Sequence, residues 1–308
     1  MTLGVSMIVK NESECIRACL DSLKGVNELI IVDTGSEDNT VDICKEYGAD
    51  VYFQQWEDDF AKARNYSLEQ CDADWILIID ADEVLKTPVS QIKSALEKTS
   101  EKYLGVIADV QTQYELIKSI RLIRNIEEIT WKGEIHNQLV YSEGNLRECC
   151  FVSSFKIESG FSPAHLKDPD RTLRILQRQL EKDPNNTRAL YYIAREYINR
   201  ANEDKVIEYL TKYFGIAFYQ LWTNELADAC YLLALAYMQK HIEKYNKGEM
   251  STHWHEAVTW AAMAVLVMPN YKAPIDFLSK AFPHYPQAAQ FWGKLLGQVK
   301  ETNVLFKR

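Results

Sequence analysis

The sequence predicts an α/β domain with a mainly parallel sheet, followed by an all-helical domain. Two observations carry this prediction. Up to about residue 85, short apolar segments alternate with amphipathic helical ones, which is typical of parallel strands joined by crossover helices. Past about residue 165 no strand-like segment remains, and apolar residues recur at helical spacing. We therefore place the α/β domain at residues 1–165 and the helical domain at residues 166–308.

The first elements are predicted from the spacing of their apolar residues. Asn11 or Ser13 is expected to cap the first helix, which has Ile16 and Leu20 on one face, and Gly48 is expected to end the second helix. The expected strands are residues 3–9, 28–32, 50–54 and 74–79, and the second and third helices are residues 40–47 and 60–70.

The pattern changes after Pro88, where one more helix is expected. Four antiparallel strands are then predicted to complete the same domain, at residues 104–113, 120–125, 130–141 and 150–157. The helices expected beyond them are residues 171–182, 187–199, 203–214, 226–239 and 254–268. Tyr-Tyr-x-x-Ala at 191–195 and Tyr-Leu-Leu-Ala at 231–234 occupy comparable places in two helix pairs. This region therefore resembles divergent tetratricopeptide repeats, with a non-repetitive helical bundle as the alternative.

Composition and charge exclude several classes of protein. The chain of 308 residues, 47% hydrophobic and 26% charged, is typical of a globular protein with two domains. Its net charge of −9 argues against nucleic acid as a partner, because phosphates would not be neutralised. No apolar run approaches the roughly 20 residues of a membrane span, and residues 1–10 lack the features of a secretory signal. With seven cysteines and no C-x-x-C pair, we expect reduced thiols in a cytoplasmic protein.

Polar clusters follow the ends of the expected strands. Residues 10–12 follow the first strand and residues 33–40 the second, Arg64 lies in the third helix, and Asp80 and Asp82 follow the fourth strand. These ends share one edge of a parallel sheet, so the clusters should converge. Neighbouring carboxylates repel unless a cation lies between them, and a hard divalent cation suits oxygen ligands that substrate phosphates complete. The set predicts a metal-dependent nucleoside diphosphate site; an acidic turn that caps the next helix is the alternative.

Four motifs in this order resemble the family 2 glycosyltransferases of GT-A fold: V-x-M-I-V-K-N-E, I-V-D-T-G-S-x-D-x-T, A-x-A-R-N and I-I-D-A-D-E. The resemblance is close over the first 85 residues and looser to about residue 160. It implies a GT-A domain that transfers a sugar, with inversion, from a nucleoside diphosphate donor, usually with manganese or magnesium. A UDP-sugar is favoured on family frequency alone. The acceptor stays open among a glycan, a lipid-linked sugar and a peptide.

The resemblance also implies roles for single residues near the nucleotide. Asp33 would bind the nucleotide base, and Val9, Lys10 and Asn11 would line the base pocket. Many family members carry Tyr where this chain has Lys10, so base stacking is not expected there.

The same resemblance implies roles near the diphosphate. Arg64 would contact the base or the diphosphate, Asp80 would face ribose or sugar beside the metal, and Asp82 would ligate the metal. A later histidine often adds a metal ligand in GT-A enzymes. Glu158 stands at that place in this chain and could ligate through oxygen, with His165 as an alternative. A solvated strand end is the other interpretation of Glu158.

Inversion requires a general base that takes the acceptor's proton. The segment 121–125 followed by Gly-x-x-His resembles a subgroup linked to tetratricopeptide-like repeats, which includes lipopolysaccharide-core glucosyltransferases and bacteriocin peptide S-glycosyltransferases. The subgroup usually has His-Glu where this chain has His136-Asn137, so His136 or Glu134 is the candidate base. On one strand these two side chains would share a face, and His136 has the more suitable intrinsic pKa. A structural or nucleotide-contacting histidine is the alternative.

Three readings of function follow. The first is a metal-dependent glycosyltransferase whose helical domain positions the acceptor or forms a homodimer. The second is a sugar nucleotidyltransferase, although residues 10–13 lack the glycine-rich loop that such enzymes carry after the first strand. The third is a catalytically inactive repeat-domain adaptor that retains nucleotide binding, which the changed residues Asn137 and Glu158 would fit.

Overall fold

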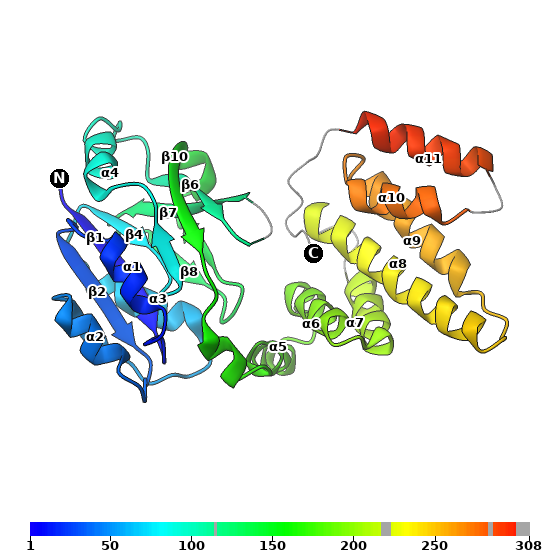
Figure 1. Ribbon diagram of the computed structural model, residues 1–308, viewed down its shortest axis with the longest axis horizontal. Helices are drawn as coiled ribbons and strands as arrows, with labels where there is room; N and C mark the ends of the chain where they lie inside the picture. The colour runs from blue at the N-terminus through cyan, green and yellow to red at the C-terminus, as the bar shows by residue number, and fades with distance from the viewer. Residues whose placement is uncertain (114–115, 217–222, 283–285, 300–308) are drawn as a thin grey trace. The chain divides into compact units, whose positions relative to one another are not determined.

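The structure is a computed structural model that describes residues 1–113, 116–216, 223–282 and 286–299. It divides into two compact units, Met1–Arg171 and Thr172–Arg308 (Figure 1). The first unit is α/β and the second is helical, as the sequence predicts. Within the described residues, no helix combines the length and apolar composition needed to cross a membrane.

A mixed sheet of eight strands forms the centre of the first unit within the described residues, in the order β3-β2-β1-β4-β7-β6-β10-β5. Strands β1 to β4 are mutually parallel where they pair, which confirms the predicted crossover arrangement. The bounds are β1 Leu3–Val9, β2 Glu28–Asp33, β3 Asp50–Phe53, β4 Trp75–Ile78, β5 Glu83–Leu85, β6 Gly105–Gln111, β7 Leu116–Arg124 and β10 Cys150–Ser159.

Two strand predictions in the second half of the first unit are wrong, and the first concerns β10. β10 lies parallel to β6, with Ile157 opposite Val110, and antiparallel only to the short strand β5, which the sequence did not reveal. The apolar pattern of a strand does not encode its direction, because side chains alternate between faces in either direction.

The expected strand 130–141 is a separate hairpin of β8 (Ile129–Lys132) and β9 (Gln138–Tyr141). Gly133 (φ 97°) and His136 (φ 46°) have left-handed backbone between the two strands, which turns the chain back on itself. A short 3₁₀ helix, η1 (Leu146–Cys149), leads from the hairpin to β10.

Helices cover both faces of the sheet. Their bounds are α1 Ile16–Ser22, α2 Thr40–Glu46, α3 Phe60–Glu69 and α4 Val89–Leu96. Gly48 has a φ of 75° just past the end of α2, as expected for a helix-ending glycine. The predicted cap of α1 is wrong: the helix begins after Cys15, without a side-chain cap. Asn11 and Ser13 instead bond to the loop after β2.

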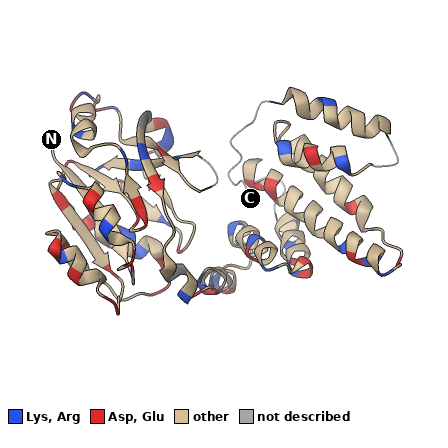
Figure 2. Cartoon of the chain, viewed as in Figure 1, with Lys and Arg blue, Asp and Glu red and all other residues tan. Residues whose placement is uncertain are grey.

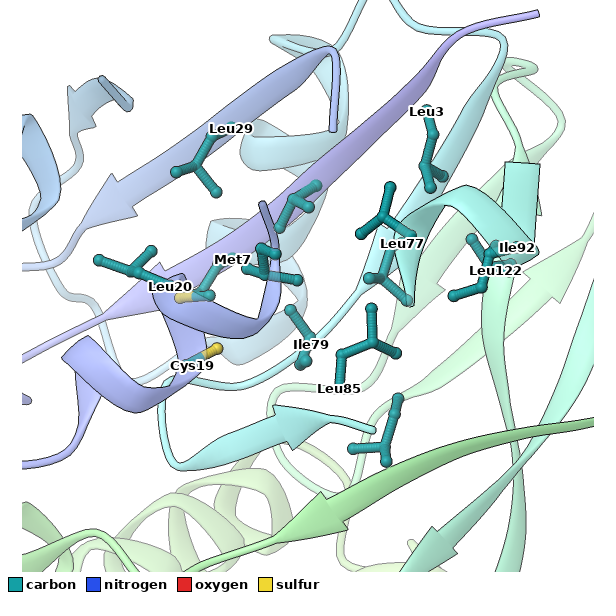
Figure 3. Packing of buried hydrophobic residues seen from close by; sticks show 14 of the residues in the cluster. Leu3, Met7, Cys19, Leu20, Leu29, Leu77, Ile79, Leu85, Ile92 and Leu122 are labelled. Atoms are coloured by element: carbon teal, nitrogen blue, oxygen red, sulfur yellow. The ribbon is translucent and has the colours of Figure 1, made fainter. Parts of the chain in front are cut away.

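The two faces of the sheet carry two apolar cores. One contains Leu3, Val5, Met7 and Val9 of β1, and Figure 3 shows part of it, with Cys19 and Leu20 of α1 beside Met7. The opposite core contains the alternate residues Ile76 and Ile78 of β4, packed under α3 and the β8–β9 hairpin. Because successive side chains of a strand point to opposite faces, strands covered on both sides read as continuous apolar runs.

The second unit is built of helices that pack against their neighbours in the chain: α6 on α7, α8 on α9 and α10 on α11. The bounds are α5 Arg171–Lys182, α6 Thr187–Asn199, α7 Glu203–Ile216, α8 Thr223–Asn246, α9 His253–Val267, α10 Lys272–Lys280 and α11 Pro286–Gln298, with the 3₁₀ helix η2 (Pro163–Lys167) before them. The sequence pattern missed α10 and α11. Each has a proline in its first turn, where the missing N–H would have no intrahelical partner.

Candidate active site

The loops after β1 and β2 are joined to each other at the carboxyl edge of the sheet. The Val9 carbonyl accepts hydrogen bonds from the Thr34 N–H (3.0 Å) and hydroxyl (3.1 Å). The Asn11 N–H donates to Ser36 Oγ (2.9 Å), and Asn11 Oδ1 accepts from the Glu37 N–H (2.8 Å). Asn11 has a left-handed backbone with φ 58°, which asparagine tolerates better than most residues. These bonds bring the first two predicted polar clusters together.

Asp33 is the buried carboxylate of this edge, only 2% exposed at the end of β2. Its Oδ2 accepts from the Gly35 and Ser36 N–H groups, each at 3.0 Å. Gly35 adopts φ 105°, a conformation that favours glycine. Asp33 therefore shapes the loop after β2, and a contact with a nucleotide base stays a prediction. Of the other residues predicted to line the base pocket, the Val9 side chain lies in the core whereas Lys10 is exposed.

Asp38 supports the same pair of loops. It accepts hydrogen bonds from the Thr40 N–H (3.0 Å) and hydroxyl (2.5 Å) and from the Ser13 N–H (3.2 Å). Burial raises the pKa of the Asp38 carboxyl, but the hydrogen bonds from Thr40 and Ser13 outweigh burial and hold the pKa below its ordinary value. The Glu12 N–H also donates to Thr40 Oγ1 (2.7 Å).

Arg64 of α3 lies at the centre of the site. Its Nη2 is 3.0 Å from Asp80 Oδ1, and its Nη1 donates to Asn137 Oδ1 at 2.9 Å. The guanidinium also stacks on Trp131 of β8, 4.7 Å from the ring centre. Asn65 holds this hairpin in place, since its amide both donates to the Trp131 carbonyl (3.0 Å) and accepts from its N–H (2.7 Å). The structure thus brings together two predicted residues, Arg64 and Asp80.

The turn from Asp80 to Glu83 is closed on itself. The Glu83 N–H donates to the Asp80 carbonyl, and the Asp80 N–H donates to Glu83 Oε2, each at 3.0 Å. Glu83 is 3% exposed and its Oε1 pairs with Arg121 Nη2 at 2.6 Å. Burial raises the pKa of Glu83 to about 7, because the Arg121 charge offsets only part of the desolvation. These contacts fix the turn that carries Asp80 and Asp82.

Asp82 is held from the other side by the segment after β10. Its carbonyl accepts from the Gly160 N–H at 2.7 Å, and a Cβ at position 160 would lie 2.5 Å from that oxygen, so only glycine fits. Two residues on, Ser162 is buried and its hydroxyl donates to Glu12 Oε2 at 2.5 Å. These contacts connect the turn after β4 to the loop after β1.

Asp80 and Asp82 fit a hard divalent cation by their chemistry. Both are partly exposed carboxylates, two residues apart in the turn after β4. In the part of the chain that the structure describes, no group of three His, Cys, Asp or Glu residues could hold a metal. The protein would therefore supply one or two carboxylates, and phosphates and water the remaining positions, which is the usual arrangement for Mg²⁺. Glu158 pairs with Lys86, and the side chain of His165 lies outside the described residues.

Glu134 and His136 lie in the loop between β8 and β9, and not on one strand as expected. The two residues therefore do not share a strand face. The Phe60 N–H donates to the Glu134 carbonyl at 2.8 Å, which ties the loop to the start of α3, and His136 is exposed. The same loop carries Asn137, the partner of Arg64. Both candidates for the base therefore lie in the same loop as a hydrogen-bond partner of Arg64. Their role as a base stays a prediction.

Three contributors to the site were missed by the sequence prediction of site residues. Trp131 stacks on Arg64, Asn137 bonds to it, and Arg121 neutralises Glu83. Each of them has its partner more than 35 residues away along the chain, so the contact could not be predicted from local sequence. Only Asn137 carried a signal of its own, as an amide at a position where a carboxylate was expected.

The first unit has the mixed α/β sheet of a GT-A domain. The sequence profile described as Glycosyl transferase family 2 matches residues 5–159, about half of the chain, and the chain belongs to that family.

Three relatives illustrate the similarity. The SPbeta prophage-derived glycosyltransferase SunS of Bacillus subtilis is 26% identical over 253 residues, 78% of this chain and 60% of that protein. The lipopolysaccharide core biosynthesis glycosyltransferase LpsC of Rhizobium meliloti is 31% identical over 110 residues, 34% of this chain and 40% of that protein. The crystal structure of S. aureus TarS 1-349 in complex with UDP is 15% identical, covers 81% of this chain and 92% of that chain, and has a TM-score of 0.42. The chain spans 60% of the length of SunS, so the activity of that whole protein does not transfer directly.

Proposed function

We propose that this chain is a metal-dependent, inverting glycosyltransferase that uses a nucleoside diphosphate sugar. The observation that carries the proposal is the contact of Arg64 with Asp80 at the carboxyl edge of the sheet, beside Asp82 and the loop of Asp33. A cationic side chain and two carboxylates at this edge match the charges of a diphosphate and a divalent cation. Membership of glycosyl transferase family 2 supports the same reaction class.

The donor site divides into a base end and a diphosphate end. Asp33 and residues 9–11 would bind the base, and Arg64 would contact the base or the diphosphate. Asp80 and Asp82 would hold Mn²⁺ or Mg²⁺, which as a Lewis acid neutralises charge that develops on the leaving diphosphate. Arg64 adds fixed positive charge in a half-buried position, where its interactions are screened less than in water.

Inversion needs a proton acceptor on the face of the sugar opposite the leaving group. His136 or Glu134 would take the proton from the attacking acceptor group as the new glycosidic bond forms and the bond to the diphosphate breaks. Their loop is tied to α3 and to Arg64, so the base and the diphosphate-binding residues are carried by connected elements.

The acceptor is proposed to be a glycan, a lipid-linked sugar or a peptide, positioned with help from the helical unit. The name of LpsC points to a glycan for that protein. A UDP-sugar is the first donor to test, because it is frequent among family 2 enzymes. Tetratricopeptide-like repeats in the second unit and a cytoplasmic location stay predictions of the sequence.

We also propose a homodimer through the helical unit. Apolar side chains are exposed there at Met250 (97%), Leu266 (74%) and Phe291 (61%), and association would bury them. Sedimentation equilibrium tests this proposal: a chain that stays monomeric at micromolar concentration contradicts it.

A thermal-shift screen tests the donor proposal. UDP, GDP, dTDP and their sugars are each added with and without Mn²⁺, and we expect a metal-dependent rise in melting temperature for one base. Asp82→Ala should abolish the metal-dependent part and donor turnover while the fold is kept, since Asp82 is not a core residue. Asp50→Ala is the matched control, because Asp50 is exposed at the opposite end of a strand.

Turnover assays run beside the screen separate the alternative functions. An inactive adaptor would bind the nucleotide with metal but release no diphosphate from the donor. A sugar nucleotidyltransferase would instead turn over a nucleoside triphosphate with a sugar phosphate. No shift with any nucleotide would contradict the donor site itself.

A further inference from the structure

The side-chain amide of Asn137 has one polar atom with a hydrogen-bond partner and one without. Its Oδ1 accepts from Arg64 Nη1 at 2.9 Å, whereas its buried Nδ2 has no hydrogen-bond partner among the described residues. Asn137 follows the left-handed residue His136 in the β8–β9 loop, directly before β9.

The contact with Arg64 decides which way the amide faces. A guanidinium only donates hydrogen bonds, so the atom of Asn137 that faces Arg64 must be the oxygen. The Nδ2 group is therefore a donor, and flipping the amide would place two donors against each other. A buried donor without an acceptor is unfavourable, and such groups often mark a place where a ligand or water completes the site.

The surroundings of this donor indicate what would complete it. Arg64, beside it, carries a positive charge and contacts Asp80, one of the two proposed metal carboxylates. An acceptor oxygen of a nucleoside diphosphate sugar is the chemistry that such a cluster of donors selects. Phosphate oxygens and sugar hydroxyls both qualify.

We propose that Asn137 binds the donor substrate directly: Oδ1 holds Arg64 in place, and Nδ2 donates a hydrogen bond to an oxygen of the nucleotide sugar. This inference rests on the proposed function. Because Nδ2 is covered by neighbouring groups in the structure, this contact requires a small shift of the loop 133–137 when the oxygen binds. Asn137 is thus both a positioning residue for Arg64 and a ligand-binding residue.

Two variants separate the two roles. Asn137→Asp keeps an oxygen for Arg64 but replaces the N–H donor with an acceptor, whereas Asn137→Ala removes both contacts. Binding of UDP and of UDP-glucose, each with Mn²⁺, is measured by calorimetry on the full chain; if the screen selects another base, its diphosphate and sugar are used. We expect both variants to weaken binding by about tenfold, the effect of one hydrogen bond, with the melting temperature of the unbound Asp variant unchanged.

Gln138→Glu is the control, because it adds the same negative charge one residue further, in β9. We expect it to bind as the wild type does. A loss already seen with UDP places the contacted oxygen on the nucleotide, and a loss seen only with UDP-glucose places it on the sugar.

Two outcomes overturn the inference. Wild-type affinity in the Asp variant would overturn it, whatever the Ala variant does, while the proposed donor site stands. The inference is also overturned if the Ala variant binds normally and the Asp variant loses no more affinity than Gln138→Glu. In that case the loss in the Asp variant comes from its added negative charge alone. A wild-type chain that binds no nucleotide overturns the donor site and this inference together.

Discussion

At the residue scale, the carboxylate turn depends on the buried ion pair of Glu83 with Arg121. Glu83 closes the Asp80 turn through its own side chain and is neutralised by Arg121 of β7. Both side chains are largely buried, with 4% and 13% of their surface exposed. Removing one member of such a pair leaves the other charge without compensation, which is more costly than losing an exposed pair.

Glu83→Ala should therefore destabilise the first unit by about 3 kcal/mol, since Arg121 and the Asp80 N–H both lose their acceptor. Urea unfolding followed by fluorescence measures the effect. Glu46→Ala is the matched control: its pair with Arg17 is exposed, and removing it should change stability by less than about 1 kcal/mol. Equal effects of the two substitutions would contradict a structural role for Glu83.

The carboxylates of this site can be predicted from the sequence alone. Asp33, Asp80 and Asp82 were expected at the ends of strands, and the structure places them there. The partners of Arg64 and Glu83 could not be predicted, because a hydrogen bond across 73 or 38 residues leaves no periodic signal in the sequence. Contacts between residues so far apart are decided by how the helices and strands pack together.

At the scale of elements, the β8–β9 loop carries the candidates for the general base. It is a turn with left-handed backbone at Gly133 and His136, where the sequence indicated a continuous strand. A strand would have placed Glu134 and His136 on one face, whereas a turn can direct them differently. One of them can therefore face the acceptor without the other.

His136→Ala and Glu134→Ala should consequently differ sharply in donor turnover while they bind the donor alike. We expect the larger loss for His136, about 100-fold or more, because its intrinsic pKa suits a base near neutrality. Release of the nucleoside diphosphate from the donor gives the rate, and calorimetry gives the affinity. Equal and mild losses would place the base elsewhere in the chain.

At the scale of the whole molecule, the helical unit has its own buried polar network. Asp228 of α8 is 2% exposed and accepts hydrogen bonds from the hydroxyls of Tyr191 (2.8 Å) and Tyr271 (2.9 Å). Burial, with the Asp228 charge nearby, raises the pKa of Tyr191, so its hydroxyl remains a donor at neutral pH. This network joins α6, α8 and the start of α10.

Asp228→Ala should lower the stability of the helical unit by roughly 2–4 kcal/mol, because two buried hydroxyls lose their acceptor. If the two units are independent, the nucleotide-induced thermal shift of the first unit should persist. Asp276→Ala, which breaks only an exposed pair with Lys280, is the control. Loss of nucleotide binding in Asp228→Ala, with the control unaffected, would show that the units are energetically coupled.

The distribution of charge belongs to the same scale. Figure 2 shows Lys and Arg interspersed with Asp and Glu on the helices of both units, in keeping with the net charge of −9.

All seven cysteines are free thiols, and burial raises the pKa of Cys44, Cys71 and Cys230 to about 12, so these thiols are poor nucleophiles.

The sequence by itself determined the alternation of strands and helices up to β4, the parallel half of the sheet and the carboxylates at its edge. These features follow from local periodicity and from the rule that parallel strands share a carboxyl edge. Only the tertiary structure decided the direction of β10, the β8–β9 hairpin and the set of groups around Arg64. Strand direction and distant side-chain contacts depend on which surfaces pack together, and apolar periodicity encodes a buried face but not its partner.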